Sequence, residues 1–355
     1  MKLLITGVCG FVGSRLARAL PERLPGLAIT GLDNLLRPGS ETNRQALADL
    51  GIRFVHGDLR MRSDMEGLPA CDWVLDAAAN PSVLAGVEGL ASARQLGEHN
   101  LAGTLNVLEY CRQHQAGLVL LSTSRVYSAR ALAALPVLAR EQAFVLDEVQ
   151  VNQPGVTREG VTEEFSTQAP RSLYGATKLA SEVMAGEYGL SFGFPVWINR
   201  CGVLAGAGQF GTAEQGIFSY WLHAHAARRR LRYIGFGGHG YQVRDALHPD
   251  DLADLVALQL RRAPPTDAVF NASGGADNAM SLAQLTAWCG ERFGAHAPEP
   301  DPRPRPFDLP WLVLNAERAR RELDWRPRRS LPSILDEIAE HARAHPDWLR
   351  RCGAE

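Results

Sequence analysis

Short apolar runs alternate with helical patterns along the first two hundred residues of the chain. Six runs have the length and character of strands, at 2–6, 27–32, 53–55, 73–77, 118–122 and 195–199. Apolar residues in the stretches between them recur with helical spacing, which is typical of a parallel sheet with helices on both faces. The pattern therefore predicts an α/β fold with a Rossmann-type doubly wound parallel sheet, whose strand ends meet at one edge.

Two of the helical stretches carry wide apolar arcs. One arc, within 100–114, consists of Leu101, Leu105, Val107, Leu108 and Cys111, and the other, after Tyr174, of Leu179, Ala180, Val183 and Met184. These arcs are wider than a simple surface helix needs. The side chains are therefore expected either to fill the core or to pair with a second copy of the chain.

The remaining chain departs from this alternation. The excursion 128–172 contains enough Leu, Val and Phe for an ordered flap, and because connections of this length often cover a site, we expect it to form part of the substrate surface. Residues 1–200 are predicted to form the dinucleotide-binding domain, to which 241–271 return. Residues 201–240 and 272–345 are expected to build a smaller mixed α/β lobe for the substrate, and 346–355 a C-terminal tail.

Composition limits the classes of function. The chain has 355 residues, 46% hydrophobic and 21% charged, and a formal net charge of −2, which is ordinary for a globular protein with two lobes. The charge gives no reason to expect nucleic acid or a membrane as partner. Neither a signal peptide nor a membrane-spanning run is visible, so a cytoplasmic location is expected. The six scattered cysteines predict neither a metal site nor a disulfide framework.

A glycine-rich turn follows the first apolar run. Gly7, Gly10 and Gly13 have the spacing G-x-x-G-x-x-G and lead directly into a helical pattern. Such glycines permit a tight turn, and the N–H groups at the helix N-terminus favour a pyrophosphate. The second run ends at Asp33, whose carboxylate can accept from both hydroxyls of an adenosine ribose and repels a 2′-phosphate. Asp33 therefore predicts NAD rather than NADP as the cofactor, although the nearby Arg37 favours NADP.

Tyr174 and Lys178 are the first candidates for chemistry. They are four residues apart in Ser-Leu-Tyr-Gly-Ala-Thr-Lys, and this spacing places both on one face of a helix. Lys178 is one of two lysines in a chain with 35 arginines, and a compact ammonium fits beside a phenol and a ribose hydroxyl better than a planar guanidinium does. Because a neighbouring cation favours the phenolate, Lys178 is expected to lower the pKa of Tyr174 toward the range of a general base.

Further motifs occur in a consistent order along the chain. They are His56-Gly-Asp58-Leu59, Asp76-Ala77-Ala78-Ala79, Asn100 in Asn-Leu-Ala-Gly-Thr, Leu121-Ser-Thr123-Ser-Arg-Val-Tyr127, Arg244-Asp245 before Leu247-His248-Pro249, and Leu323-Asp-Trp-Arg-Pro327. With the glycine turn and the Tyr-Lys pair, they resemble the extended short-chain dehydrogenase/reductase family. Its members include NAD-dependent epimerases and dehydratases of nucleotide sugars, and the resemblance covers most of the chain.

The resemblance implies a set of residues for each part of the site. It implies that NAD is bound by Gly7, Gly10, Phe11, Val12, Gly13, Asp33, Asn34, Asp58, Leu59, Ala77, Ala78, Ala79, Asn100, Tyr174 and Lys178. It implies catalysis by Thr123, Tyr174 and Lys178, and binding of a nucleotide-diphosphate sugar by Thr123, Ser124, Gln209, Gln215 and Arg244. It also implies a homodimer that pairs the two helices with apolar arcs.

The residues after Thr123 bear on the type of reaction. Family members that eliminate water often carry an acid in the next two positions, whereas this chain has Ser124 and Arg125, so elimination is disfavoured. Segments 206–216 and 242–248 look most like the CDP-tyvelose/CDP-paratose 2-epimerase branch. This similarity implies an epimerase acting at carbon 2 of a CDP-, GDP- or UDP-hexose. The alternatives are a reductase, dehydratase or decarboxylase of the same family, or a non-catalytic NAD-binding module.

Several arginines are open to two interpretations. Arg244 is interpreted as a bidentate ligand of the diphosphate, with a structural ion pair as the alternative. For Arg200, the structural ion pair is the preferred interpretation and the diphosphate ligand is the alternative. The basic cluster at 228–232 is interpreted as a solvated helix end rather than a phosphate-facing patch.

Overall fold

The computed structural model describes residues 1–87 and 92–354. Its largest feature is a seven-stranded sheet in the order β14-β10-β5-β4-β1-β2-β3, with every neighbouring pair parallel. The strands are β1 (Lys2–Thr6), β2 (Ala28–Asp33), β3 (Arg53–His56), β4 (Trp73–Asp76), β5 (Gly117–Thr123), β10 (Val196–Cys201) and β14 (Val269–Ala272). Each of the six predicted runs forms one of these strands, and the predicted fold class is confirmed.

Successive residues of a strand point to opposite sides of the sheet. The apolar side chains of the large sheet are therefore buried on both faces, and helices cover each face. Leu3 and Ile5 of β1 join a core with α1 (Phe11–Arg23), α9 (Pro249–Gln259) and α11 (Glu317–Leu323). Leu4 points the other way, into a core with α5 (Gly103–His114) and α7 (Leu173–Phe192). Shorter elements of this part are η1 (Ser40–Thr42), α2 (Asn43–Asp49), α3 (Arg62–Glu66), α4 (Ala93–Gly97), the π-helical turn η2 (Glu98–Ala102) and η3 (Ser124–Val126).

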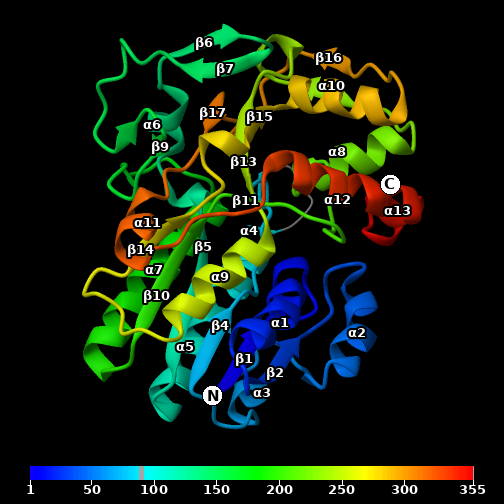
Figure 1. Cartoon of the computed structure of the whole chain (residues 1–355). Coiled ribbons are helices and arrows are strands. Elements are labelled where there is room, and N and C mark those ends of the chain that lie inside the picture. Colours follow the sequence, from blue (N-terminus) through cyan, green and yellow to red (C-terminus); the bar gives the residue numbers. More distant parts are fainter. Residues whose placement is uncertain (88–91, 355) are drawn as a thin grey trace.

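A second group of elements lies above the large sheet in Figure 1. Its four-stranded mixed sheet consists of β11 (Val203–Leu204), β13 (Val243–Leu247), β15 (Ala279–Ser281) and β17 (Trp311–Leu312). Around it lie α8 (Ile217–Ala226), α10 (Leu282–Phe293), α12 (Leu331–Ala344), α13 (Trp348–Arg351), η4 (Phe236–Gly238), η5 (Ala276–Asn278) and the pair β12 (Arg232–Ile234) and β16 (Glu299–Asp301). Within 241–271, α9 and β14 lie with the large sheet, whereas β13 belongs to the small one.

None of the helices in residues 1–87 and 92–354 combines the length and the apolar character needed to cross a membrane.

The excursion 128–172 is ordered, but it does not have the expected place. It forms α6 (Ala129–Ala133), the hairpin β6 (Val137–Arg140) and β7 (Ala143–Leu146), and the short pair β8 (Val156–Thr157) and β9 (Gly160–Val161). Its Val161 and Phe165 are buried in a core with Trp311 and Leu314 of the second group. None of its residues lines the central cavity described below. The expectation that it forms part of the substrate surface is therefore wrong, because its apolar side chains pack against the second group of elements instead.

Candidate active site

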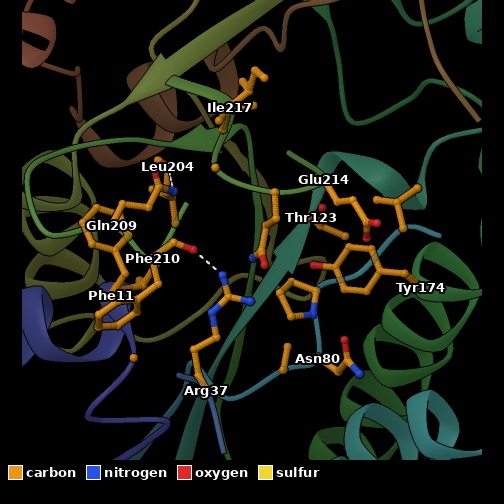
Figure 2. A pocket seen from close by; sticks show the side chains of 18 of the residues that line it. Phe11, Arg37, Asn80, Thr123, Tyr174, Leu204, Gln209, Phe210, Glu214 and Ile217 are labelled. Atoms are coloured by element: carbon orange, nitrogen blue, oxygen red, sulfur yellow. Dashed lines mark hydrogen bonds between the residues drawn. The ribbon is translucent and has the colours of Figure 1, made fainter. Parts of the chain in front are cut away.

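A cavity of about 1140 Å³ lies at the carboxyl ends of the parallel strands. One wall comes from the ends of β1, β2, β4 and β5 and the start of α7, and the other from the loop 201–217 and from β13 and its neighbours. Figure 2 shows Tyr174 and Thr123 on one side of this space and Gln209 and Phe210 on the other. Open α/β sheets bind their ligands at this edge.

The glycine turn after β1 forms one end of the cavity. Gly7 has a φ of +65°, a left-handed conformation that glycine adopts without strain. A Cβ on Gly13 would clash with the carbonyl oxygen of Gly7, so the close approach of α1 to the turn requires glycine there. Gly10 caps α1 without a side-chain hydrogen bond, and no side chain competes for the N–H groups of the first turn. This cradle fits a pyrophosphate.

Asp33 stands at the end of β2, beside the glycine turn. Its carboxylate accepts hydrogen bonds from the backbone N–H groups of Cys9 and Leu35, both at 2.8 Å. Burial raises the pKa of Asp33, and these backbone bonds oppose the rise. The guanidinium of Arg37 donates to the carbonyl of Phe210 on the opposite wall, as Figure 2 shows. Arg37 is thus engaged with the loop 201–217, whereas Asp33 lies where a ribose is expected.

Other residues predicted to bind NAD are also on the cavity wall. Asn34 donates to the carboxylate of Asp58 at 3.0 Å, and an ion pair with Arg60 at 2.6 Å holds the pKa of Asp58 well below its usual range. A Cβ on Gly7 would lie 2.9 Å from the Cα of Ala78, so the end of β4 closely approaches the glycine turn. The wall here includes Phe11, Val12, Leu59, Ala77, Ala78 and Ala79.

The two residues with candidate catalytic hydroxyls both line the cavity. Thr123 is the last residue of β5, and Tyr174 is the second residue of α7. Ser172 begins this helix by accepting a hydrogen bond from the N–H of Gly175 at 3.1 Å, which fixes the first turn that carries Tyr174. Figure 2 shows the Tyr174 hydroxyl pointing into the cavity.

Lys178 lies one turn further along α7, buried behind this wall rather than on it. Burial lowers the pKa of its ammonium, and the neighbouring Asp76, Glu182 and Cys201 oppose that change. Its positive charge is therefore partly offset by two acidic neighbours.

Burial raises the pKa of Tyr174 to about 12, and Thr123 and, more weakly, Arg125 oppose the rise. The expected action of Lys178 on this pKa stays a prediction, with Lys178 buried one turn further along the same helix.

Asn100 lies behind the cavity wall, in the π-helical turn η2. Its side chain bonds both backbone groups of Asn80, at 2.7 and 2.9 Å, and donates to the hydroxyl of Thr177 at 3.2 Å. Since Asn80 lines the cavity, Asn100 joins the loop after β4 to the helix of Tyr174. Turns of this π-helical kind are frequent at functional sites.

The residues predicted to bind substrate all line the cavity. Ser124 follows Thr123 directly. Gln209 donates to the carbonyl of Leu204 at 2.7 Å, and Gln215 pairs through its backbone with Thr212. Arg244 forms an ion pair with Asp308 at 3.2 Å.

Other arginines divide into structural and cavity-facing groups. Arg200 forms a buried ion pair with Glu182 at 2.8 Å, so its structural interpretation holds. In the basic cluster, Arg230 and Arg232 line the cavity and form ion pairs with Glu299 and Asp301. The guanidinium groups of Arg228 and Arg229 donate hydrogen bonds to backbone carbonyls instead. Arg230 and Arg232 are both exposed, so the predicted solvated cluster holds, and its side chains also reach the rim of the cavity.

Sequence reasoning missed residues whose role depends on the fold. A Cβ on Gly175 would clash with the carbonyl oxygen of Arg125, so this glycine lets α7 and η3 touch. The available signal was a glycine in the first turn of a helix, where its propensity is poor. Arg125, Arg305 and Glu214 also line the cavity, and no motif in the sequence marked them as a group.

The fold and the site together define an NAD-binding protein of the Rossmann type. The family model described as the NAD dependent epimerase/dehydratase family matches residues 3–273. The chain belongs to this family, and its cofactor is NAD.

Relatives of known activity resemble the chain over nearly all of its length. It is 28% identical over 340 residues to a CDP-paratose 2-epimerase from Salmonella typhi, covering 93% of this chain and 96% of the relative. It is also 28% identical to a dTDP-glucose 4,6-dehydratase from Streptomyces niveus, covering 98% and 94%. The crystal structure of a UDP-glucose 4-epimerase from Thermus thermophilus in complex with NAD is 28% identical, with a TM-score of 0.75 over 97% of this chain and 99% of the other.

Proposed function

We propose that the protein is an NAD-dependent nucleotide-sugar epimerase that acts through a transient keto-sugar at carbon 2 of a CDP-, GDP- or UDP-hexose. The observation that carries this proposal is that Thr123 and Tyr174 line one cavity together with the glycine turn and Asp33. A hydroxyl pair beside a dinucleotide cradle is the arrangement that oxidation of a sugar alcohol needs.

Each residue has a distinct part in the proposed chemistry. NAD, when bound, supplies a hydride acceptor that returns the hydride in the same cycle. Tyr174 takes the proton from a sugar hydroxyl and later gives it back. Thr123 donates and accepts a hydrogen bond at that hydroxyl and so fixes its orientation. We assign Lys178 to the nicotinamide ribose, a role that requires its buried ammonium to reach the cavity from behind the wall.

The residues near Thr123 support epimerisation over elimination. Ser124 and Arg125 stand where family members that eliminate water often carry acids, and neither is a proton-transfer acid near neutral pH. Glu214 is a carboxylate that lines the cavity from the second group of elements. A dehydratase is therefore the second candidate function, and Glu214 would be the first residue to test for it.

Two observations support carbon 2 as the reacting position. The CDP-paratose 2-epimerase from Salmonella typhi aligns over 93% of the chain. Segments 206–216 and 242–248, which look most like that branch, include Gln209, Gln215 and Arg244 on the cavity wall. Because a dehydratase and a 4-epimerase are equally identical to the chain, only products can decide the position.

The deciding experiment incubates the purified protein with CDP-, GDP- and UDP-hexoses and trace NAD, and follows the sugars by NMR. We expect a new carbon-2 epimer without net NADH. A deoxy-keto product would establish a dehydratase, and stoichiometric NADH would establish a dehydrogenase.

The matched control for this panel is Tyr174→Phe. It is expected to lower turnover by 10²- to 10⁴-fold with NAD affinity unchanged. An active Tyr174→Phe protein would remove Tyr174 as the base.

We also infer a homodimer formed through α5 and α7. Within their apolar arcs, Val107, Leu108 and Cys111 are buried in the core, whereas Leu105 and Val183 remain exposed. The two helices pack side by side, so their exposed apolar side chains form one candidate face for a second copy.

A further inference from the structure

A hydrogen bond joins the two walls of the cavity at its dinucleotide end. The guanidinium of Arg37, in the loop after β2, donates to the backbone carbonyl of Phe210 in the loop 201–217, as Figure 2 shows. Both residues line the cavity, and Arg37 follows Asp33 by four positions. Phe210 shares an apolar core with Phe11, the residue that begins α1 after the glycine turn. The bond therefore lies beside both groups that would hold the dinucleotide, the Asp33 carboxylate and the N-terminus of α1.

The C-terminal helix supports Phe210 from behind. The ring of Phe210 stacks on that of Trp348 in α13, with the ring centroids 5.6 Å apart. The indole N–H of Trp348 donates to the carbonyl of Gln209 at 2.9 Å, and the hydroxyl of Ser219 in α8 donates to the same carbonyl at 3.2 Å. Trp348 is buried and is not part of the cavity wall. The segment 209–210 is therefore fixed on the side that faces away from the cavity.

The loop after β2 fits closely against the same segment. Gly39 has a φ of +90°. A Cβ on Gly39 would lie 3.0 Å from the ring of Phe210 and 3.3 Å from the carbonyl oxygen of Arg351 in α13. The loop after β2, the segment 209–210 and α13 thus meet at one junction, and the side chain of Arg37 is the part of this junction that reaches across the cavity.

We propose that Arg37 and Phe210 form a latch over the dinucleotide end of the cavity, backed by Trp348, which must open whenever NAD enters or leaves. The latch joins protein to protein, so it slows both directions of cofactor exchange. A side chain that only bound NAD directly would act mainly on its departure. The inference rests on NAD as the cofactor, and it does not depend on the proposed sugar chemistry.

The test measures both rate constants for NADH, with purified protein freed of bound nucleotide by charcoal. Stopped-flow fluorescence after mixing with NADH gives the association rate constant. Displacement of bound NADH by excess NAD gives the dissociation rate constant. We expect Arg37→Met to raise both rate constants about tenfold, because a charged hydrogen bond that closes the latch is lost, and to change the dissociation constant by less than about threefold. Arg37→Lys should recover part of the slow exchange, since an ammonium can also donate to a carbonyl.

Two further variants separate a latch from a ligand of NAD. Trp348→Phe keeps an aromatic ring against Phe210 but removes the donor to Gln209, at a position that is not on the cavity wall. It should also raise both rate constants, by about threefold. Arg53→Met, which removes an exposed arginine of β3 that is not on the cavity wall, should leave both rate constants unchanged. Thermal unfolding verifies that each variant is folded.

Three results would overturn the inference. The first is a pair of unchanged rate constants in Arg37→Met, or in Trp348→Phe if Arg37→Met does not fold. The second is faster dissociation with unchanged association in Arg37→Met, which would make Arg37 a direct ligand of NAD. The third is an equal effect of Arg53→Met.

The outcome for the latch is independent of the outcome for the proposed function. The assay uses NADH without a sugar, so it tests the latch even if every sugar in the panel fails. Conversely, a latch that fails this test leaves an epimerase activity of the wild type intact.

Discussion

Asp33 is held in place by the backbone of its own site. The N–H groups of Cys9 and Leu35 fix its carboxylate at the cavity wall, where a 2′-phosphate would meet a negative charge. We expect Asp33→Asn to lower the ratio of NAD affinity to NADP affinity by about tenfold. The substitution removes a charged hydrogen bond to the ribose of NAD and also the repulsion between the Asp33 carboxylate and the 2′-phosphate of NADP. Calorimetric titration with both dinucleotides measures the ratio.

The control for this variant is Asp49→Asn, which neutralises an exposed carboxylate at the end of α2. It should leave both affinities unchanged. A ratio that is unaffected by Asp33→Asn would show that this carboxylate does not contact the ribose.

Single residues could be predicted where their chemistry is visible in a local motif. Tyr174 and Thr123 have recognisable neighbours in the sequence, and both line the cavity. Arg125 could not be predicted as a neighbour of Phe307, because 182 positions separate them.

The junction of α7 with η3 depends on a glycine in the first helical turn. A methyl group on Gly175 would displace the carbonyl of Arg125, so Gly175→Ala should destabilise the protein by about 1–3 kcal/mol. It should also lower activity, because Thr123 and Tyr174 lie on either side of this contact. Chemical denaturation and the product assay measure the two effects.

Gly186 is a matched control in the same helix. No atom lies within 4 Å of a Cβ built there, so Gly186→Ala should stabilise the protein by about 0.5–1 kcal/mol through helix propensity. Equal effects of the two substitutions would show that the close contact with Arg125 is unimportant.

Strands were predictable as elements because their apolar runs are short, regular and bounded. The excursion 128–172 was harder, since an apolar flap looks the same whether it covers a ligand or packs on another layer. Its Phe165 is buried in a core with Trp311, a contact between segments that no local pattern specifies.

The contact between α8 and α12 includes two hydrogen-bonded histidines. The ring nitrogens of His223 and His341 are 3.0 Å apart, and burial lowers the pKa of His223 to about 4 and that of His341 to about 3. Both pKa values lie below those of unfolded histidine, so the unfolded state binds more protons between about pH 6.5 and 4. The contribution of the two neutral histidines to the free energy of unfolding is therefore complete above this pH window and is lost as the pH falls through it.

The expected loss is roughly 1.4 kcal/mol for each unit of pKa depression that is traversed. Thermal unfolding measured across the window should show a weaker pH dependence for His341→Gln than for the wild type. His239→Gln, which changes an exposed histidine, should behave as the wild type. Identical slopes in all three proteins would contradict a role for the pair.

At the scale of the whole molecule, the cavity exists because two groups of elements face each other. The large sheet and its helices supply the glycine turn, Asp33, Thr123 and Tyr174, and the second group supplies Arg244 and the loop 201–217. Phe11 of α1 shares a small apolar core with Phe210 and Trp348, which joins the dinucleotide end to the C-terminal helix. The cofactor end and the substrate end are thus coupled through packing as well as through the cavity.

The helix that carries Tyr174 also carries the exposed face proposed for the dimer. Val183 lies on α7 with 58% of its surface exposed. At the centre of a two-fold interface, Val183→Glu would bring two like charges together, so the dimer dissociation constant should rise about a hundredfold. Sedimentation velocity at several concentrations measures this change.

Val149→Glu is the matched control, since Val149 is 94% exposed on the excursion, away from α5 and α7. It should leave the assembly unchanged. Because α7 begins at the active site, the Val183→Glu monomer should retain NAD binding but lose part of its turnover if the dimer supports the first turn of the helix. A Val183→Glu protein that sediments as the wild type does would exclude this face as the interface, whatever the assembly of the wild type.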